Sequence, residues 1–390
     1  MVTSPHIIGW AHTPFGRLPH EDVEALIAAI GSAAIEDSGL EPRDIDAIYV
    51  GVFNNGFSAQ GFEGALAGAA MPELAGVPAT HVENACATGS AAIFAALDRI
   101  EAGRARTVLV VGAEKMTSTA NSEVNRILLS GSHRRTEASA GSFAGVFAGL
   151  ADQYANRYGD PHDAMAMIAA KNHRNGVDNP WAHMRKDLGF DFCATESERN
   201  PKVAGRLLRT DCSMVSDGAA AMVITHADVA RTARRSVVVR GRGHVNDHLA
   251  VAARPDPLAL TGAGRAFRTA IDEASVTLQD LDLLETHDCF TIAELLQYEA
   301  FGIAEPGKAA QVLASGATDR DGWLPVNVSG GLKSKGHPLG ATGVSQHVMA
   351  AMQLVGEAGA MQLAKANRAA VFNMGGSGVA NYATVLESGR

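Results

Sequence analysis

Two stretches of the chain carry the same pattern of residues. Residues 34–48 read AIEDSGLEPRDIDAI, and residues 270–284 read AIDEASVTLQDLDLL. They align without a gap at an offset of 236 residues, and two aspartates near the end of each stretch coincide. Each stretch is typical of the end of an amphipathic helix, a short acidic connection and then an apolar strand. The match indicates two related α/β units in one chain.

A second pair of similar segments follows in the same order. Cys86-Ala-Thr-Gly begins a predicted helix of small residues in the first half, and Gly340-Ala-Thr-Gly begins one in the second. The strand predicted after each helix starts behind an arginine, Arg106 in one case and Arg368 in the other. Three matched features in one order favour an internal duplication over a chance similarity between α/β units.

The alternation of strands and helices predicts an α/β fold with mixed sheets. The helices predicted at 86–100 and 341–354 are apolar on most sides, as buried helices are. We therefore expect them to lie between two sheets in a layered sandwich. Residues 117–212 have no counterpart in the second half and are too many for a single loop. The predicted domains are an N-terminal half (1–116 and 213–232), an inserted loop domain (117–212) and a C-terminal half (233–390).

The composition narrows the class of protein. Of 390 residues, 46% are hydrophobic and 19% are charged, which excludes disorder as the main state. A net charge of −9 without a long basic run argues against nucleic acid as a partner. The long uncharged stretches 336–356 and 369–386 contain glycine and polar residues, so we interpret them as buried core and not as membrane spans.

The four cysteines are scattered and form no Cys-x-x-Cys pair. This usage fits a reducing compartment, and with no evident signal peptide it predicts a cytoplasmic protein. Cys86 lies between a strand-like run and a helix, where the helix dipole would lower the pKa of the thiol and favour the nucleophilic thiolate. A buried structural cysteine is the competing interpretation, and the local sequence leaves both open.

Two histidines and a second thiol are further candidates for catalysis. His337 precedes the second small-residue helix, so pseudo-symmetry would bring it close to Cys86, where it could take a proton from the thiol or donate to a carbonyl oxygen. It could equally be a loop histidine that binds backbone groups. His287 and Cys289 are two residues apart at the end of a strand and point to the same side. Their spacing lacks the partners of a zinc site, so we expect no metal.

The remaining candidates have plainer alternatives. Gly375, in the run Asn373-Met-Gly-Gly-Ser-Gly, could direct an N–H at a reacting oxygen, although glycine turns are common. Arg134 and Arg135 could bind phosphates, although exposed arginines are usually only solvated. Phe147, in the apolar run 143–150, could line an acyl site. We interpret Cys193 and Cys212 as structural, because no catalytic pattern surrounds them.

These motifs resemble those of the thiolases. The segment Cys86-Ala-Thr-Gly, the block Gly336-His-Pro-x-Gly-Ala-Thr-Gly and the glycine-rich strand end follow in the order that family uses, and the resemblance runs nearly end to end. His287-Asp-Cys-Phe is similar to the sterol-carrier-protein-type branch, whereas the biosynthetic and mitochondrial branch has Asn-Glu-Ala-Phe. Many thiolases carry a second cysteine where this chain has Asn373, a role that Cys289 can replace.

The resemblance implies a duplicated five-layered α-β-α-β-α sandwich and Claisen-type acyl transfer. Cys86 would attack the 3-keto carbonyl of an acyl-CoA and hold the acyl group as a thioester. His337 would activate Cys86, His287 and His337 would stabilise the enolate oxygen, and Cys289 would move the α-proton. The N–H groups of Cys86 and Gly375 would form the oxyanion hole of the thioester.

The family also implies the ligands and partners. Coenzyme A and acyl-CoA would be substrates, with no permanently bound cofactor, and the chain would form a homodimer through the core of the first half, or a tetramer. We expect no membrane or nucleic-acid partner. The direction stays open between degradation, as in fatty acid β-oxidation, and condensation. Two alternatives remain: a C–C lyase or other acyltransferase acting with a small partner protein, and a non-enzymatic CoA- or lipid-binding scaffold, which paired thiols and histidines disfavour.

Overall fold

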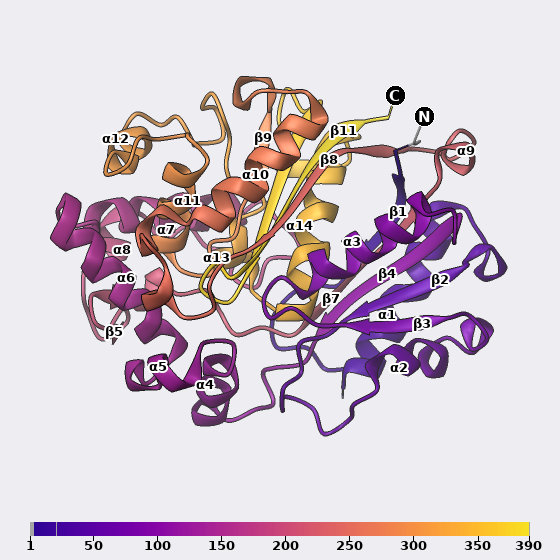
Figure 1. Cartoon of the computed structure of the whole chain (residues 1–390), viewed down its shortest axis with the longest axis horizontal. Helices are drawn as coiled ribbons and strands as arrows, with labels where there is room; N and C mark the ends of the chain where they lie inside the picture. Colours follow the sequence, from indigo (N-terminus) through magenta and orange to yellow (C-terminus); the bar gives the residue numbers. More distant parts are fainter. Residues whose placement is uncertain (1–3, 21, 390) are drawn as a thin grey trace.

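The computed structural model describes residues 4–20 and 22–389 (Figure 1). Nine strands form one mixed sheet in the order β3-β2-β4-β7-β1-β8-β11-β10-β9. Their bounds are β1 His6–His12, β2 Ala47–Gly51, β3 Ala79–Val82, β4 Thr107–Glu114, β7 Gly218–Thr225, β8 Val237–Asn246, β9 Leu283–Glu285, β10 Arg368–Gly375 and β11 Ala380–Ser388.

The two halves of this sheet meet at a narrow seam. Strands β1 and β8 pair antiparallel through two residue pairs, His6 with Val238 and Ile7 with Val237. Everything on the β3 side of the seam comes from the first half of the fold, and everything on the β9 side comes from the second. The sheet is therefore two similar sheets joined edge to edge, which refines the prediction of two separate ones.

Helices complete a sandwich of five layers. Helices α1 (Val23–Ser38) and α2 (Glu63–Ala70) cover the outer face of the first half-sheet, and α10 (Thr261–Ala274) covers that of the second, with α11 (Thr291–Ala300) in the same core. Helices α3 (Thr88–Glu101) and α14 (Leu339–Leu354) pack against each other in the middle. The predicted duplicated sandwich and its buried central helices are confirmed.

The strands divide their side chains between these layers, as the two-residue period of a strand requires. On β4, Val108 and Val110 face the central helices, whereas Leu109 and Val111 face α1 and α2. All four are fully buried, which explains why the strand reads as a continuous apolar run.

The aspartates of the repeated stretch have the same contacts in both halves. The Oδ2 atom of Asp46 accepts from two backbone N–H groups at the start of β4, at 2.7 and 3.0 Å. The Oδ2 atom of Asp282 accepts from two at the start of β10, at 2.7 and 3.1 Å. Asp44 and Asp280 each close a short 3-10 turn by accepting from the N–H three residues earlier, at 2.9 and 2.8 Å. The sequence repeat is therefore a structural repeat.

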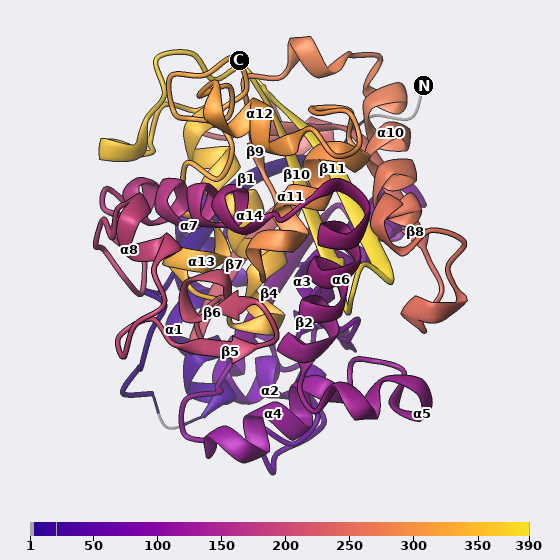
Figure 2. The ribbon, with the colours of Figure 1, turned by 90° about the vertical axis from the view of Figure 1, so that its left-hand side faces the viewer.

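Residues 117–212 contribute no strand to the nine-stranded sheet. They form five α-helices and a two-stranded ribbon (Figure 2). Their bounds are α4 Asn121–Leu129, α5 Arg134–Glu137, α6 Phe143–Tyr158, α7 His162–Gly176, α8 Phe190–Ala194, β5 Lys202–Ala204 and β6 Leu207–Leu208. Residues 121–129 pack against Phe53 and Met116 of the first half, whereas residues 143–176 lie beside the second half. Helix α7 packs against α11, α12 (Ala309–Ala314) and α13 (Gly331–Lys335), and a four-residue helix α9 (Ala227–Ala230) lies near β1. In the described part of the chain, no helix is long and apolar enough to cross a bilayer.

The central helices approach so closely that glycine is required between them. A Cβ atom added at Gly343 of α14 would lie 2.3 Å from the backbone nitrogen of Ser90 in α3. One added at Gly89 of α3 would lie 2.8 Å from the backbone nitrogen of Val344. Real Cβ contacts are not that short, so the two backbones touch because neither residue has a side chain.

We expect Gly343→Ala to destabilise the fold by about 1–3 kcal/mol, because the new methyl group meets backbone that cannot move aside. Gly149→Ala is the matched control, since Gly149 is also inside a helix and has nothing within 4 Å of the added Cβ. Alanine there should be neutral or stabilise by up to about 1 kcal/mol. Thermal and denaturant unfolding measure both, and equal stabilities of the two variants would contradict the contact.

Candidate active site

Cys86 lies in the turn between β3 and α3, two residues before the helix begins. Ala85, just before it, has a φ of +51°, a conformation that bends the chain sharply into the helix. The sulfur accepts hydrogen bonds from the N–H groups of Gly376 and of Cys86 itself. The side chain is 7% exposed, so it is nearly buried yet reaches a cavity.

The prediction of a lowered pKa for Cys86 is wrong. Burial raises the pKa of this thiol to about 12, and the nearby carboxylates of Glu114 and Glu83 add to the shift. The two N–H groups at the start of α3 and in the glycine turn offset only part of it. The resting thiol is therefore neutral, and a base must take its proton when it reacts.

Two histidines from distant segments meet at Cys86. The Sγ atom of Cys86 and one ring nitrogen each of His287 and His337 all lie within 4.8 Å of one another. The imidazole rings are perpendicular, with centroids 5.1 Å apart. The Nε2 atom of each ring is buried and has no hydrogen-bond partner among the described residues. Thiolate and imidazole are also ligands for zinc, so these three side chains are the group here that could hold a metal.

The partners of the Nδ1 atoms distinguish the two histidines. Asn373 Nδ2 donates to the carbonyl oxygen of Cys86 at 3.2 Å, which fixes the orientation of the amide, and lies 2.9 Å from Nδ1 of His287. His287 Nδ1 therefore accepts, and its Nε2 carries the proton. Thr342 Oγ1 donates to the carbonyl oxygen of Pro338 at 2.8 Å, so at 2.7 Å it accepts from Nδ1 of His337. His337 Nε2 is therefore left with a free lone pair.

Both rings are neutral in this environment. Burial, together with the charge of Lys335, lowers the pKa of His337 to about 3. Burial and the neighbouring His337 lower the pKa of His287 well below its usual value. The site thus presents a hydrogen-bond donor at His287 and a base at His337 on either side of a neutral thiol.

A cavity of about 210 Å³ opens onto the thiol and is lined mainly by apolar side chains. Cys86, Cys289 and His337 reach it, so the predicted second thiol lies in the same cavity as the first. Cys289 is 2% exposed, and burial followed by the nearby Cys86 raises the pKa of its thiol well above the usual range. The inserted segment and the loops around it supply Met116, Val124, Asn125, Leu128, Phe143, Ala144, Val203, Cys212, Ser213, Met214 and Val215 to the lining.

Other predicted residues lie elsewhere. Phe147 is 1% exposed and stacks on Phe290 at 4.4 Å between ring centroids, so it is core beneath the cavity, and Phe143, one turn earlier on α6, forms the wall. Cys212 also lines the cavity, which corrects its interpretation as a cysteine without catalytic surroundings. The N–H of Gly376 donates to the sulfur, and the neighbouring Gly375 packs against Asn84 and Ala87 of the Cys86 turn. Arg134 and Arg135 are exposed on α5, outside the cavity.

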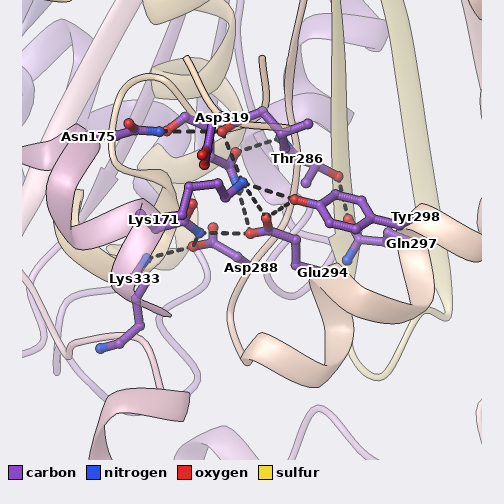
Figure 3. A network of polar contacts seen from close by, with 12 residues as sticks. Lys171, Asn175, Thr286, Asp288, Glu294, Gln297, Tyr298, Asp319 and Lys333 are labelled. Carbon is purple, nitrogen blue, oxygen red and sulfur yellow. Dashed lines mark hydrogen bonds and ion pairs between the residues drawn. The ribbon is translucent and has the colours of Figure 1, made fainter. Parts of the chain in front are cut away.

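A network of buried polar side chains joins α7 and α11 to the segment that carries Asp288 (Figure 3). Lys171 of α7 donates to Glu294 Oε1 at 2.8 Å and to the Tyr298 hydroxyl at 2.9 Å, and Tyr298 also binds Glu294. Asn172 Nδ2 donates a hydrogen bond to Glu294 Oε2 and another to Asp288 Oδ2, each at 2.7 Å, and so links the two carboxylates. Sequence reasoning missed this network, although a charged residue inside the His287-Asp-Cys289 motif was a signal for it.

Comparisons with known proteins identify the family of this chain. The family model for the thiolase N-terminal domain matches residues 6–192, and that for the thiolase C-terminal domain matches residues 243–388. The acetyl-CoA acetyltransferase of Methanothermobacter thermautotrophicus is 35% identical over 95% of this chain and 96% of its own. Sterol carrier protein 2 of Gallus gallus is 30% identical over 95% of this chain and 69% of its own. The chain belongs to the thiolase family and is an acyltransferase.

Solved structures share the fold. The Ltp2-ChsH2(DUF35) aldolase superposes with a TM-score of 0.82 at 19% identity, covering 100% of this chain and 98% of that one. Human mitochondrial 3-ketoacyl-CoA thiolase in complex with CoA superposes with a TM-score of 0.73 at 18% identity, covering 100% and 99%.

The raised pKa of Cys86 predicts that no thiolate forms at this residue around neutral pH. The absorbance difference at 240 nm between the wild type and Cys86→Ala should stay flat from about pH 6 to pH 10, because the folded thiol titrates near pH 12. A difference that titrates below pH 9 would show that the helix dipole outweighs burial.

Thr342→Val removes the hydroxyl that accepts from Nδ1 of His337, so the imidazole can change tautomer. Because losing a buried hydrogen bond costs about 1–3 kcal/mol, acylation of Cys86 should slow roughly tenfold to a hundredfold. Thr384→Val is the matched control, because Thr384 Oγ1 lies 2.8 Å from Nε2 of His347, a buried histidine of α14. Single-turnover acylation with acetoacetyl-CoA measures both. If both variants acylate equally fast, the role of Thr342 in setting the tautomer is refuted.

Proposed function

We propose that Cys86 is the nucleophile of a thiolase reaction in which His337 is its base. The observation that carries this proposal is the meeting of a neutral thiol with two neutral imidazoles, whose Nε2 atoms have no partner among the described residues and differ in protonation. His337 Nε2 takes the thiol proton as the sulfur attacks the 3-keto carbonyl of an acyl-CoA. No low-pKa thiolate is needed, because the proton leaves as the new bond forms.

The carbon–carbon bond then breaks, and the electrons move into an acetyl-CoA enolate. The proton on His287 Nε2 and the one now on His337 Nε2 both point toward the enolate oxygen. Cys289 gives its thiol proton to the enolate carbon, and acetyl-CoA leaves. The N–H of Cys86 and the glycine turn at 375–376 hold the oxyanion of the acyl-enzyme, with Gly376 the donor that already reaches the sulfur.

A second coenzyme A then attacks the thioester and gives its thiol proton to the Cys289 thiolate. The shortened acyl-CoA leaves, and the proton on His337 returns to the Cys86 sulfur. The same steps in reverse condense two acyl-CoA molecules, and the residues set no direction. Cys289 inside the cavity favours acyl transfer over a lyase or a non-enzymatic scaffold, because neither of these needs a second thiol there.

The acyl and CoA parts of the substrate have separate places. The acyl group occupies the apolar cavity, whose 210 Å³ leaves room for more than an acetyl group. A shallow groove along α6 shares Asn125, Ala144 and Val203 with the cavity and is otherwise lined mostly by alanine and glycine. The pantetheine arm lies in this groove, and Arg134 and Arg135, on the helix just before its outer end, bind the CoA phosphates.

The assembly and location follow from the same features. Strand β3 is an edge of the sheet and is half-exposed next to the turn of Cys86, so a homodimer forms through this edge. Four free cysteines fit the cytoplasm. A small partner protein is a further option, since the structural neighbour Ltp2 is an aldolase solved with ChsH2.

The wild type should gain one acetyl group on mixing with acetoacetyl-CoA, and Cys86→Ala should gain none. Cys289→Ala should still form the adduct more slowly but lose the exchange of acetyl-CoA α-protons with D₂O, because the proton carrier is missing. Intact-protein mass spectrometry and NMR measure the two reactions. An adduct on Cys86→Ala would place the nucleophile elsewhere, and normal exchange by Cys289→Ala would refute the role of Cys289.

A further inference from the structure

We propose that Asp288 is a positioning residue for acyl transfer. Its carboxylate joins the segment that carries His287 and Cys289 to the short helix that leads into His337. The inference rests on the roles proposed above for these three side chains, and it gives a function to the residue between His287 and Cys289.

Asp288 makes hydrogen bonds to two different helices, α13 and α7. Its Oδ1 atom accepts from the backbone N–H of Leu332 at 2.6 Å, and its Oδ2 atom from that of Lys333 at 3.0 Å. These two residues lie in α13, which ends at Lys335, two residues before His337. Asn172 Nδ2 donates to Oδ2 from the other side at 2.7 Å. Asp288 is fully buried, so water cannot replace these bonds.

The backbone of α13 is shaped to receive the carboxylate. Gly331 has a φ of +57°, and a Cβ atom there would lie 2.3 Å from Asp288 Oδ2. Only a residue without a side chain lets the carboxylate reach the first turn of the helix. The close approach of Asp288 to Gly331 sets the distance between the segment that carries His287 and the segment that leads into His337.

An ionised carboxylate suits this place better than a neutral group of the same shape. All three partners are N–H donors, and the carboxylate is acceptor-only. An asparagine would turn its own NH₂ group toward at least one of these donors. Burial and the charge of Glu294 make the ionised form costly and raise the pKa of Asp288 to about 7.

The position of Asp288 distinguishes it from residues that bind the candidate catalytic residues directly. Thr342 binds the ring of His337, and Asn373 binds the ring of His287 and the backbone of Cys86. Asp288 instead links both sides, so its loss should disturb two chemical steps together: proton removal from Cys86 by His337, and proton transfer by Cys289. A merely structural residue would lower stability without this pattern.

The test compares Asp288→Asn with Asp282→Asn in the full-length enzyme. Asp282 is also a nearly buried carboxylate that accepts from two backbone N–H groups, but at the far end of β10 from Asn373. For Asp288→Asn we expect about a 10²-fold loss in both the rate of Cys86 acylation and acetyl-CoA proton exchange, with KM changed less than about threefold. Asp282→Asn should keep both rates within about threefold of the wild type, whatever its melting temperature.

Rates for Asp288→Asn within about threefold of the wild type would overturn the inference, as would equal losses in both variants. A wild type that forms no adduct on Cys86 would instead refute the proposed function, so the two failures are distinct. If Asp288→Asn does not fold, Asn172→Ala removes one donor from the carboxylate and leaves α13 in contact. Its kcat should fall about tenfold at unchanged KM, and an unchanged kcat would equally overturn the inference.

Discussion

The direct backbone contact between α3 and α14 is the constraint on which the site depends. Because glycines lie at the crossing, the two helices touch with nothing between them, and their first turns come together at the centre of the molecule. Cys86 and His337 each lie two residues before the start of one of these helices. A crossing one side chain wider would separate the thiol from its base by more than a proton transfer can span.

The same burial that brings these groups together keeps them uncharged. Thiol and imidazoles are neutral at rest, because the apolar surroundings penalise every ionised form. Charge therefore arises only during the reaction, where fixed N–H groups are already directed at it.

The repeated stretch and the motif residues made much of this predictable. Asp46 and Asp282 recur because each lies before one strand and accepts hydrogen bonds from the backbone at the start of its neighbour. A repeat of that kind is visible in the sequence alone. The roles of Thr342 and Asn373 were not visible, since a tautomer depends on which distant atom faces Nδ1. The direction of the Cys86 pKa shift was misjudged for the same reason: a helix start can be recognised locally, but the depth of burial cannot.

The duplication has a consequence for how such a site could arise. Cys86 lies just before α3 of the first half, and His337 lies just before α14 of the second. In the repeated motif Cys86 matches Gly340 and not His337, so the two side chains are not copies of one ancestral position. The two halves therefore repeat the scaffold but not the chemistry. Neither half holds the proposed site alone, because each carries only one of the two groups that must meet.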